Sequence, residues 1–130
     1  MIYSDIFLSF LRNTAHAGDI DDDCPTITER AGSIVNGDVI VLMLAIDSNK
    51  IKKASFRAQG SPAIIAAGEY VCRQLEGKGF ENISSELTAN VILEALELPM
   101  HFVHIASLMM TVLQQCKDSF NGLQGSGKLP

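Results

Sequence analysis

The sequence predicts an α+β domain in which helices pack on one face of a small antiparallel three-stranded sheet. Candidate strands are grouped between residues 26 and 59, before most of the candidate helices. Within that group, residues 39–46 form an unbroken apolar run, and residues 51–59 alternate between apolar and polar side chains. Strands that precede the helices, rather than alternate with them, are typical of α+β proteins.

A β-hairpin is the central element of this prediction. The run from Val39 to Ile46 is rich in β-branched residues and too short for a lone helix, so we interpret it as a strand. Residues 47–50 (Asp-Ser-Asn-Lys) favour a turn, because Asp and Asn side chains bond to their own backbone. Alternation along Ile51 to Gln59 predicts two faces, one with Ala54, Phe56 and Ala58, the other with Lys53, Ser55 and Arg57.

The hairpin also predicts where a site could form. If Asp47 pairs with Lys50 and the register stays constant, Asn36 lies opposite Ser61. The loop 36–38 (Asn-Gly-Asp) and the loop 60–62 (Gly-Ser-Pro) then meet at one end of the sheet. Glycine in each loop would allow close approach of the backbone, so these loops are the candidate site.

Helical spacing and turn residues place the remaining elements. We expect helices over Tyr3 to Arg12 with Ser4 as N-cap, from Pro62 to an end near Gly77-Lys78-Gly79, and over His101 to Phe120, with one or two short helices in 84–98 ended by Pro99. The last helix is expected to face inward with Val103, Ala106, Met109 or Met110, and Leu113. Thr26 to Arg30 is a candidate edge strand. Residues 1–121 would form one domain, followed by a flexible Gly-rich tail over 122–130.

Composition narrows the class of function. A net charge of −5 argues against nucleic acid or an anionic membrane as partner. The three cysteines, Cys24, Cys72 and Cys116, form no CxxC pair, so neither a disulfide framework nor a zinc knuckle is indicated. The start of the chain lacks the pattern of a signal peptide, and we expect a cytoplasmic protein. An enzyme is not expected, because Ser61 has no nucleophile-elbow pattern around it.

At the level of motifs, the chain resembles the NifU/IscU-type iron–sulfur cluster assembly scaffold from Tyr3 to Phe120. Its segment 32–38 (Gly-Ser-Ile-Val-Asn-Gly-Asp) is similar to the family's Gly-x-Pro-x-Cys-Gly-Asp. Its segment 60–66 (Gly-Ser-Pro-Ala-Ile-Ile-Ala) is similar to Gly-Cys-Gly-Ser-Ala-Ile-Ala. Its segment 98–106 (Leu-Pro-Met-His-Phe-Val-His-Ile-Ala) is similar to Leu-Pro-Pro-Val-Lys-Leu-His-Cys-Ser. Only Leu98-Pro99 of the chaperone-recognition segment is kept, and Phe102 replaces the family's lysine.

What the resemblance implies is a scaffold that binds iron or a cluster and donates it to cluster-assembly proteins. The family's three cysteine positions, however, hold Asn36, Ser61 and Ile105. Thiolates are the ligands of iron–sulfur clusters, so the pattern predicts a degenerate site with no metal or cluster held stably. Around the family's pocket the chain keeps Asp38 and His104, which with Asn36 and Ser61 are the candidate binding residues.

Two alternatives stay open at this site. Asp38 and His104 could together hold zinc or iron weakly, with waters completing the shell. Alternatively, Asp38 caps its loop while His104 bonds a backbone group, and the protein is a metal-free interaction or oligomeric module. The strand 39–46 favours self-association, because Val41, Met43 and Ala45 would face outward as an apolar patch. The other explanation for that patch is a covering element, such as the segment Asp19 to Arg30 folding across it.

Overall fold

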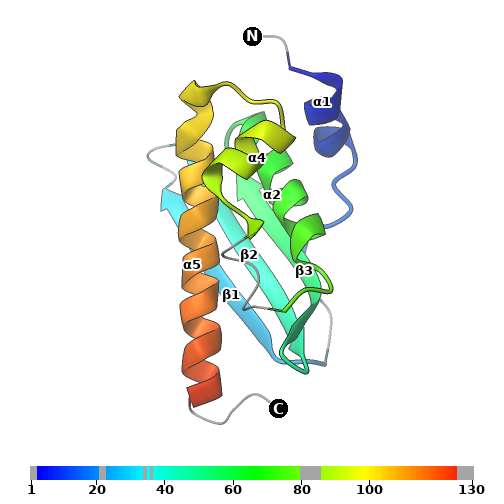
Figure 1. Cartoon of the computed structure of the whole chain (residues 1–130), viewed down its shortest axis with the longest axis vertical. Helices are drawn as coiled ribbons and strands as arrows, with labels where there is room; N and C mark the ends of the chain where they lie inside the picture. The colour runs from blue at the N-terminus through cyan, green and yellow to red at the C-terminus, as the bar shows by residue number, and fades with distance from the viewer. Residues whose placement is uncertain (1–2, 21–22, 34, 36, 80–85, 126–130) are drawn as a thin grey trace.

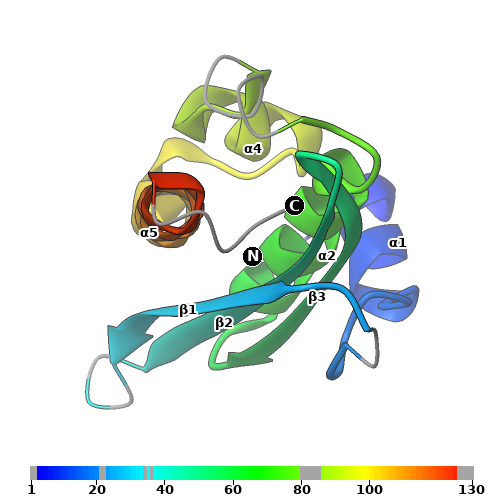
Figure 2. The same ribbon diagram turned by 90° about the horizontal axis from the view of Figure 1, so that it is seen from below.

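The computed structural model (Figure 1) shows an antiparallel three-stranded sheet in the order β1-β2-β3, accompanied by helices. It describes residues 3–20, 23–33, 35, 37–79 and 86–125. Viewed along the sheet, α2, α4 and α5 all lie on the same side of it (Figure 2), so the predicted α+β class is confirmed. The elements are α1 (Asp5–Arg12), β1 (Thr26–Ser33), β2 (Asp38–Asp47), β3 (Lys50–Gln59), α2 (Pro62–Leu75), α4 (Ala89–Ala95), a 3-10 turn η1 (Met100–Phe102) and α5 (Val103–Gly125).

Local sequence signals explain where the helices begin. The Ser4 hydroxyl accepts a hydrogen bond from the Phe7 main-chain N–H at 3.1 Å, which makes Ser4 the N-cap of α1 as predicted. Pro62 occupies the first turn of α2, where its missing N–H costs no hydrogen bond. The Thr88 hydroxyl caps α4 by accepting from Val91 N–H at 3.2 Å. Helix α5 continues to Gly125, past the predicted end at Phe120, and residues 126–130 of the predicted tail lie outside the described residues.

The hairpin contains a β-bulge that the constant-register prediction lacked. Asp47 pairs with Lys50 and Ile46 with Ile51 as predicted, but Ala45 then pairs with Lys53, so the register shifts by one residue. Cross-strand partners point to the same face of a sheet. Without the shift, the inward side chains of β2 would have been paired with the outward side chains of β3. The bulge therefore places both apolar faces against the helices.

The core lies between this inner sheet face and the helices. The inner side chains of β2, among them Ile40, Leu42 and Leu44, are fully buried, and Phe56 of β3 is 1% exposed. From α5, Ala106, Met109 and Leu113 face inward as predicted. Val103 does not: its side chain is 45% exposed, because it lies in the first turn of α5 at the edge of the core.

The predicted apolar patch on the outer sheet face is corrected by the structure. Met43 is only 8% exposed and Ala45 is fully buried within the single chain, and Val41 is half-buried. The segment after α1 accounts for part of this burial, since outward side chains of β3 bond to it. The Ser55 hydroxyl donates to the Gly18 carbonyl, and Arg57 forms an ion pair with Asp19. Self-association itself stays a prediction.

A buried polar cluster holds that segment in place. His16 and Ala17 run beside Phe56 of β3, with hydrogen bonds from Phe56 N–H to His16 O and from Gly18 N–H to Phe56 O. Glu69 of α2 is fully buried, and its carboxylate accepts from the His16 main-chain N–H at 2.9 Å and from Arg73 Nε at 2.8 Å. These bonds pin the segment 13–19 to α2, which lies on the other side of the β3 edge.

No helix among the described residues is both long enough and apolar enough to cross a membrane.

Candidate functional site

Two loops meet at the end of the sheet where β2 begins and β3 ends. The approach is close enough that a side chain on Gly60 would collide with its neighbours. A Cβ atom there would lie 2.3 Å from both Asp38 Oδ1 and Gly37 O, and the φ of Gly60 is +135°. Glycine tolerates that backbone conformation and leaves room for the carboxylate. This contact brings Asp38 and Ser61, two of the four predicted site residues, together.

Asp38 is fixed by the start of α2. Its Oδ1 accepts hydrogen bonds from the Ser61 main-chain N–H at 2.9 Å and from the Ser61 hydroxyl at 3.0 Å. Ser61 is the N-cap residue of α2, yet its own side chain makes no capping hydrogen bond. The carboxylate of Asp38 takes over that role, because the positive end of a helix dipole favours a negative charge. Asp38 thus links the start of β2 to the N-cap residue of α2.

His104 completes the group from the first turn of α5. Its Nε2 lies 3.8 Å from Asp38 Oδ2, beyond hydrogen-bonding distance. The histidine side chain is 60% exposed and the Asp38 side chain 14% exposed, so a solvent-exposed imidazole faces a largely buried carboxylate. Phe102 stacks near the imidazole, with 6.3 Å between ring centroids. Asp38 Oδ1 is thus occupied, whereas Oδ2 points toward the histidine.

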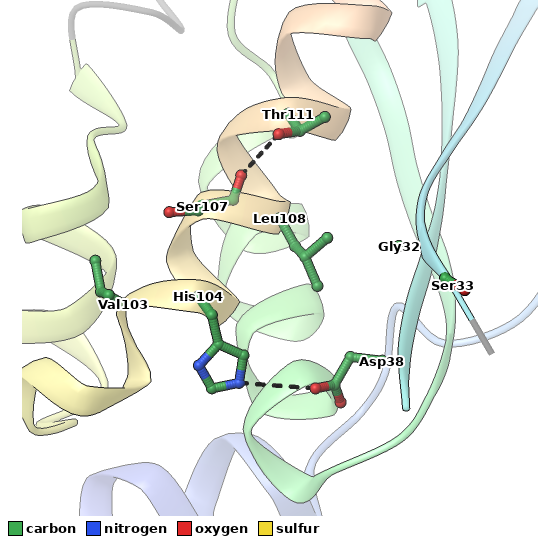
Figure 3. A pocket seen from close by; sticks show the side chains of 8 residues that line it. All are labelled: Gly32, Ser33, Asp38, Val103, His104, Ser107, Leu108 and Thr111. Atoms are coloured by element: carbon green, nitrogen blue, oxygen red, sulfur yellow. Dashed lines mark hydrogen bonds and ion pairs between the residues drawn. The ribbon is translucent and has the colours of Figure 1, made fainter. Parts of the chain in front are cut away.

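An open cavity of about 510 Å³ adjoins this pair (Figure 3). Helix α5 lines it on one side with residues spaced along a single face, and the end of β1 lines the other. The lining residues are Gly32, Ser33, Asp38, Val103, His104, Ser107, Leu108 and Thr111. Sequence reasoning did not find this cavity; the helical spacing of His104, Ser107, Leu108 and Thr111 is the signal that could have indicated it.

The other predicted positions do not join the pair. Asn36 lies outside the described residues. Ile105 is fully buried and belongs to the hydrophobic core, so its side chain contributes packing and no ligand atom.

The cysteines are remote from this site or inaccessible. Cys72 and Cys116 are fully buried. Burial, followed by the charges of Glu69 and Glu76 and by Cys116, raises the pKa of the Cys72 thiol well above its usual value. Burial and the charge of Glu29 raise the pKa of Cys116 to about 12. Cys24 precedes β1 at the end of the sheet opposite Asp38, and the strand between them spans roughly 24 Å.

Comparison with known proteins identifies the family. The NifU-like N-terminal domain family matches residues 2–126, nearly the whole chain. The chain belongs to the NifU-like N-terminal domain family. An iron–sulfur cluster assembly scaffold protein, IscU 1, of Archaeoglobus fulgidus is 27% identical over 115 residues, which is 88% of this chain and 73% of that protein. An iron–sulfur cluster assembly protein IscU of Plasmodium falciparum is 31% identical over 107 residues, 82% of this chain and 65% of that protein.

Solved structures of NifU-like proteins share the fold. A putative scaffold protein for the SUF system from Fervidobacterium islandicum superposes with a TM-score of 0.73 at 17% identity, covering 88% of this chain and 96% of that one. The N-terminal part of a nitrogen-fixing NifU-like protein from Brucella abortus gives 0.66 at 13% identity, covering 87% and 90%. The predicted resemblance and fold are thus confirmed.

Within this NifU-like domain, the site does not fit an iron–sulfur cluster. Clusters are held by thiolates, and the side chains that converge here are a carboxylate, a hydroxyl and an imidazole. Among the described residues, no group of three or more His, Cys, Asp or Glu side chains is arranged to hold a metal ion. Among the described residues, Asp38 Oδ2 and His104 Nε2 are an oxygen and a nitrogen atom that face each other at 3.8 Å.

Proposed function

We propose that this protein is a degenerate member of the iron–sulfur cluster assembly scaffolds, which does not hold a cluster through ligands of its own. Instead, Asp38 and His104 offer a weak two-ligand site for iron(II) or zinc, and the protein acts non-catalytically with protein partners of cluster assembly. The observation that carries the proposal is the pairing of Asp38 with Ser61. The hydroxyl at a former ligand position donates to Asp38 Oδ1, which leaves only Oδ2 to face His104.

The geometry of the pair supports weak cation binding. Two ligands of one tetrahedral zinc ion lie roughly 3.3 Å apart, given bonds of about 2.0–2.1 Å. The observed distance between Oδ2 and Nε2 is 3.8 Å, and the exposed His104 ring has room to close it. Waters would have to supply the remaining ligands, so affinity should be low.

A second candidate is a metal-free interaction module. It is favoured by apolar side chains exposed near this end of the protein. Val35 of the β1–β2 loop is 94% exposed, Met100 is 68% exposed and Val103 is 45% exposed. Exposed apolar groups that gather in one region are typical of protein-binding surfaces. Self-association through Val41, Met43 and Ala45 is not part of this candidate, because two of these residues are buried.

One experiment separates cluster binding from the proposal. The protein is incubated anaerobically with iron(II) and sulfide, desalted, and examined for retained iron and for visible charge-transfer absorption. We expect no colour and no retained iron. Stoichiometric iron with charge-transfer bands would overturn the degenerate assignment. A variant that restores the family's thiols, Asn36→Cys with Ser61→Cys and Ile105→Cys, serves as the positive control for the assay.

A second experiment separates the two-ligand site from the metal-free module. Zinc binding is measured by calorimetry for the parent protein and for Asp38→Ala and His104→Ala. The proposal expects weak binding that each substitution abolishes, whereas His101→Ala, an exposed histidine three residues away, leaves it unchanged. Binding that survives both substitutions would rule out the Asp38–His104 site, and no binding by the parent protein would favour the metal-free module.

A further inference from the structure

The cavity beside α5 has a largely apolar wall that contains one negatively charged side chain, Asp38. Of its eight lining residues, only Asp38 carries a formal charge at neutral pH, and His104 is the one other titratable group. Among the described lining residues there is neither lysine nor arginine. In this part of the wall the carboxylate therefore sets the sign of the local potential.

The carboxylate has one oxygen available to a ligand. Asp38 Oδ1 already accepts from the N–H and the hydroxyl of Ser61, which fixes the side chain. In the described part of the chain, Oδ2 faces His104 Nε2 at 3.8 Å, which is too long for a hydrogen bond. A fixed acceptor at the edge of a cavity is the arrangement that a donor head group of a ligand requires.

The rest of the cavity is suited to an aliphatic body. Val103 and Leu108 supply apolar surface, and Gly32 presents backbone without a side chain (Figure 3). Thr111 directs its hydroxyl to the Ser107 carbonyl at 3.0 Å, which leaves its methyl group for the wall. Along the helix, His104 and Thr111 are separated by about 10 Å, the length of a short alkyl chain. The cavity volume of about 510 Å³ lies in the range of small-molecule sites.

We propose that this cavity binds a small amphipathic cation, a primary amine on an aliphatic chain, with its ammonium group at Asp38 Oδ2 and its chain along α5 toward Thr111. This goes beyond the proposed function, since it requires neither iron nor a protein partner. An ammonium group donates hydrogen bonds, and its positive charge complements the negative charge of the Asp38 carboxylate. A carboxylate head would be repelled by Asp38, and an uncharged head would forgo the ion pair.

The test uses three probes that share one alkyl chain: hexylammonium, hexanol and hexanoate. Each is titrated into metal-free protein in the presence of a chelator, and amide chemical shifts are followed by NMR. Because metal is absent, the result does not depend on whether Asp38 and His104 bind a metal ion. We expect shifts at the lining residues of α5 and β1, millimolar affinity typical of fragments, and binding of hexylammonium about fivefold tighter than hexanol. Hexanoate should bind most weakly.

Two variants check the assignment. Asp38→Asn should remove the preference for hexylammonium over hexanol. Ser107→Leu, a change at an exposed position that fills the cavity, should weaken all three probes, whereas Gln114→Leu, on an exposed part of the same helix, should not. If Asp38→Asn fails to fold, the comparison of the three probes on the parent protein still shows whether the cavity prefers a cationic head group. Equal affinity for hexylammonium and hexanol, tighter binding of hexanoate, or shifts confined to other surfaces would overturn the proposal.

Discussion

Asp38 and Ser61 are joined by two hydrogen bonds that end on a single oxygen atom. Oδ1 of Asp38 accepts from the Ser61 N–H at 2.9 Å and from its hydroxyl at 3.0 Å. The residues are 23 positions apart in the chain, so this contact ties the start of β2 to the start of α2. The Asp38 carboxylate thus satisfies the N–H of Ser61, the N-cap residue of α2, and the loss of these bonds has consequences that can be measured.

Removing the Asp38 carboxylate should destabilise the fold. Asp38→Ala deletes the acceptor of both Ser61 bonds and the negative charge at the start of α2, so we expect a loss of about 1–2 kcal/mol in the free energy of unfolding. Urea denaturation followed by circular dichroism measures it. Asp23→Asn, at an exposed position, is the matched control and should change stability little. Equal stabilities of the Asp38 variant and the parent would contradict the capping role.

The buried carboxylate of Glu69 should contribute more to the free energy of unfolding than the carboxylate of Asp38 does. It accepts from the His16 main chain at 2.9 Å, lies 2.6 Å from His16 Nδ1 and accepts from Arg73 Nε at 2.8 Å. Glu69→Ala leaves the His16 N–H without its acceptor and removes the ion pair to Arg73, which keeps its hydrogen bond to Asn13 O. We expect this change to cost about 3 kcal/mol. Chemical denaturation provides the measurement, with the exposed Glu94→Ala as control. If the two variants lose the same small amount, the cluster does not stabilise the segment 13–19.

Gly68 should be intolerant of even a methyl group. A Cβ atom at this position of α2 would lie 2.6 Å from Cδ2 of Phe56, whose ring is in the core. Alanine is the better helix former, but the collision should outweigh that gain, and we expect Gly68→Ala to destabilise by about 1–3 kcal/mol. Thermal unfolding tests this.

The matched control for that change is Gly122→Ala in α5, where an added Cβ would meet nothing within 4 Å. This variant should be neutral or slightly stabilising, since only the helix propensity changes. In a protein that already carries Phe56→Leu, Gly68→Ala should cost less stability than it costs in the parent protein. Strictly additive effects of the two changes would show that the ring is not the cause.

Thiol labelling should distinguish one cysteine from the other two. Burial raises the pKa of Cys72 well above its usual value and that of Cys116 to about 12, so neither forms the reactive thiolate near neutral pH. Cys24 is half-buried and should react with iodoacetamide in the native protein. Mass spectrometry is expected to find a single adduct, and three only in denaturant. Rapid native labelling of Cys72 or Cys116 would contradict the packing described for α2 and α5.

Much of the secondary structure could be predicted because its signals are local. Ser4 caps α1, Pro62 opens α2, and the apolar run after Val39 forms β2, as expected from residues close in sequence. The bulge at Ala45 could not be predicted from a constant register, although the two faces of β3 imply it. A turn fixes the pairing next to it, but the requirement that both apolar faces meet the helices is imposed by packing.

Exposure was predicted less well than secondary structure. Met43 and Ala45 were expected on a solvent-facing patch, and they are buried. Val103 was expected inside, and it is 45% exposed. Periodicity assigns a side chain to a face, yet burial depends on what lies over that face. The segment near Gly18, bonded to Ser55, covers part of the outer face, and nothing in the strand pattern indicates such a cover.

By itself the sequence determined the family motifs, the α+β class and the residues Asn36, Ser61 and Ile105 at the positions that the resemblance matches to the family's cysteines, because these depend on residue identity and order. Only the tertiary structure decided how the residues of the candidate site are arranged. It placed Asp38 against Ser61 and 3.8 Å from His104, put Ile105 in the core, and opened a cavity along α5. These relationships join residues far apart in the chain, and their distances are set by how the helices pack on the sheet.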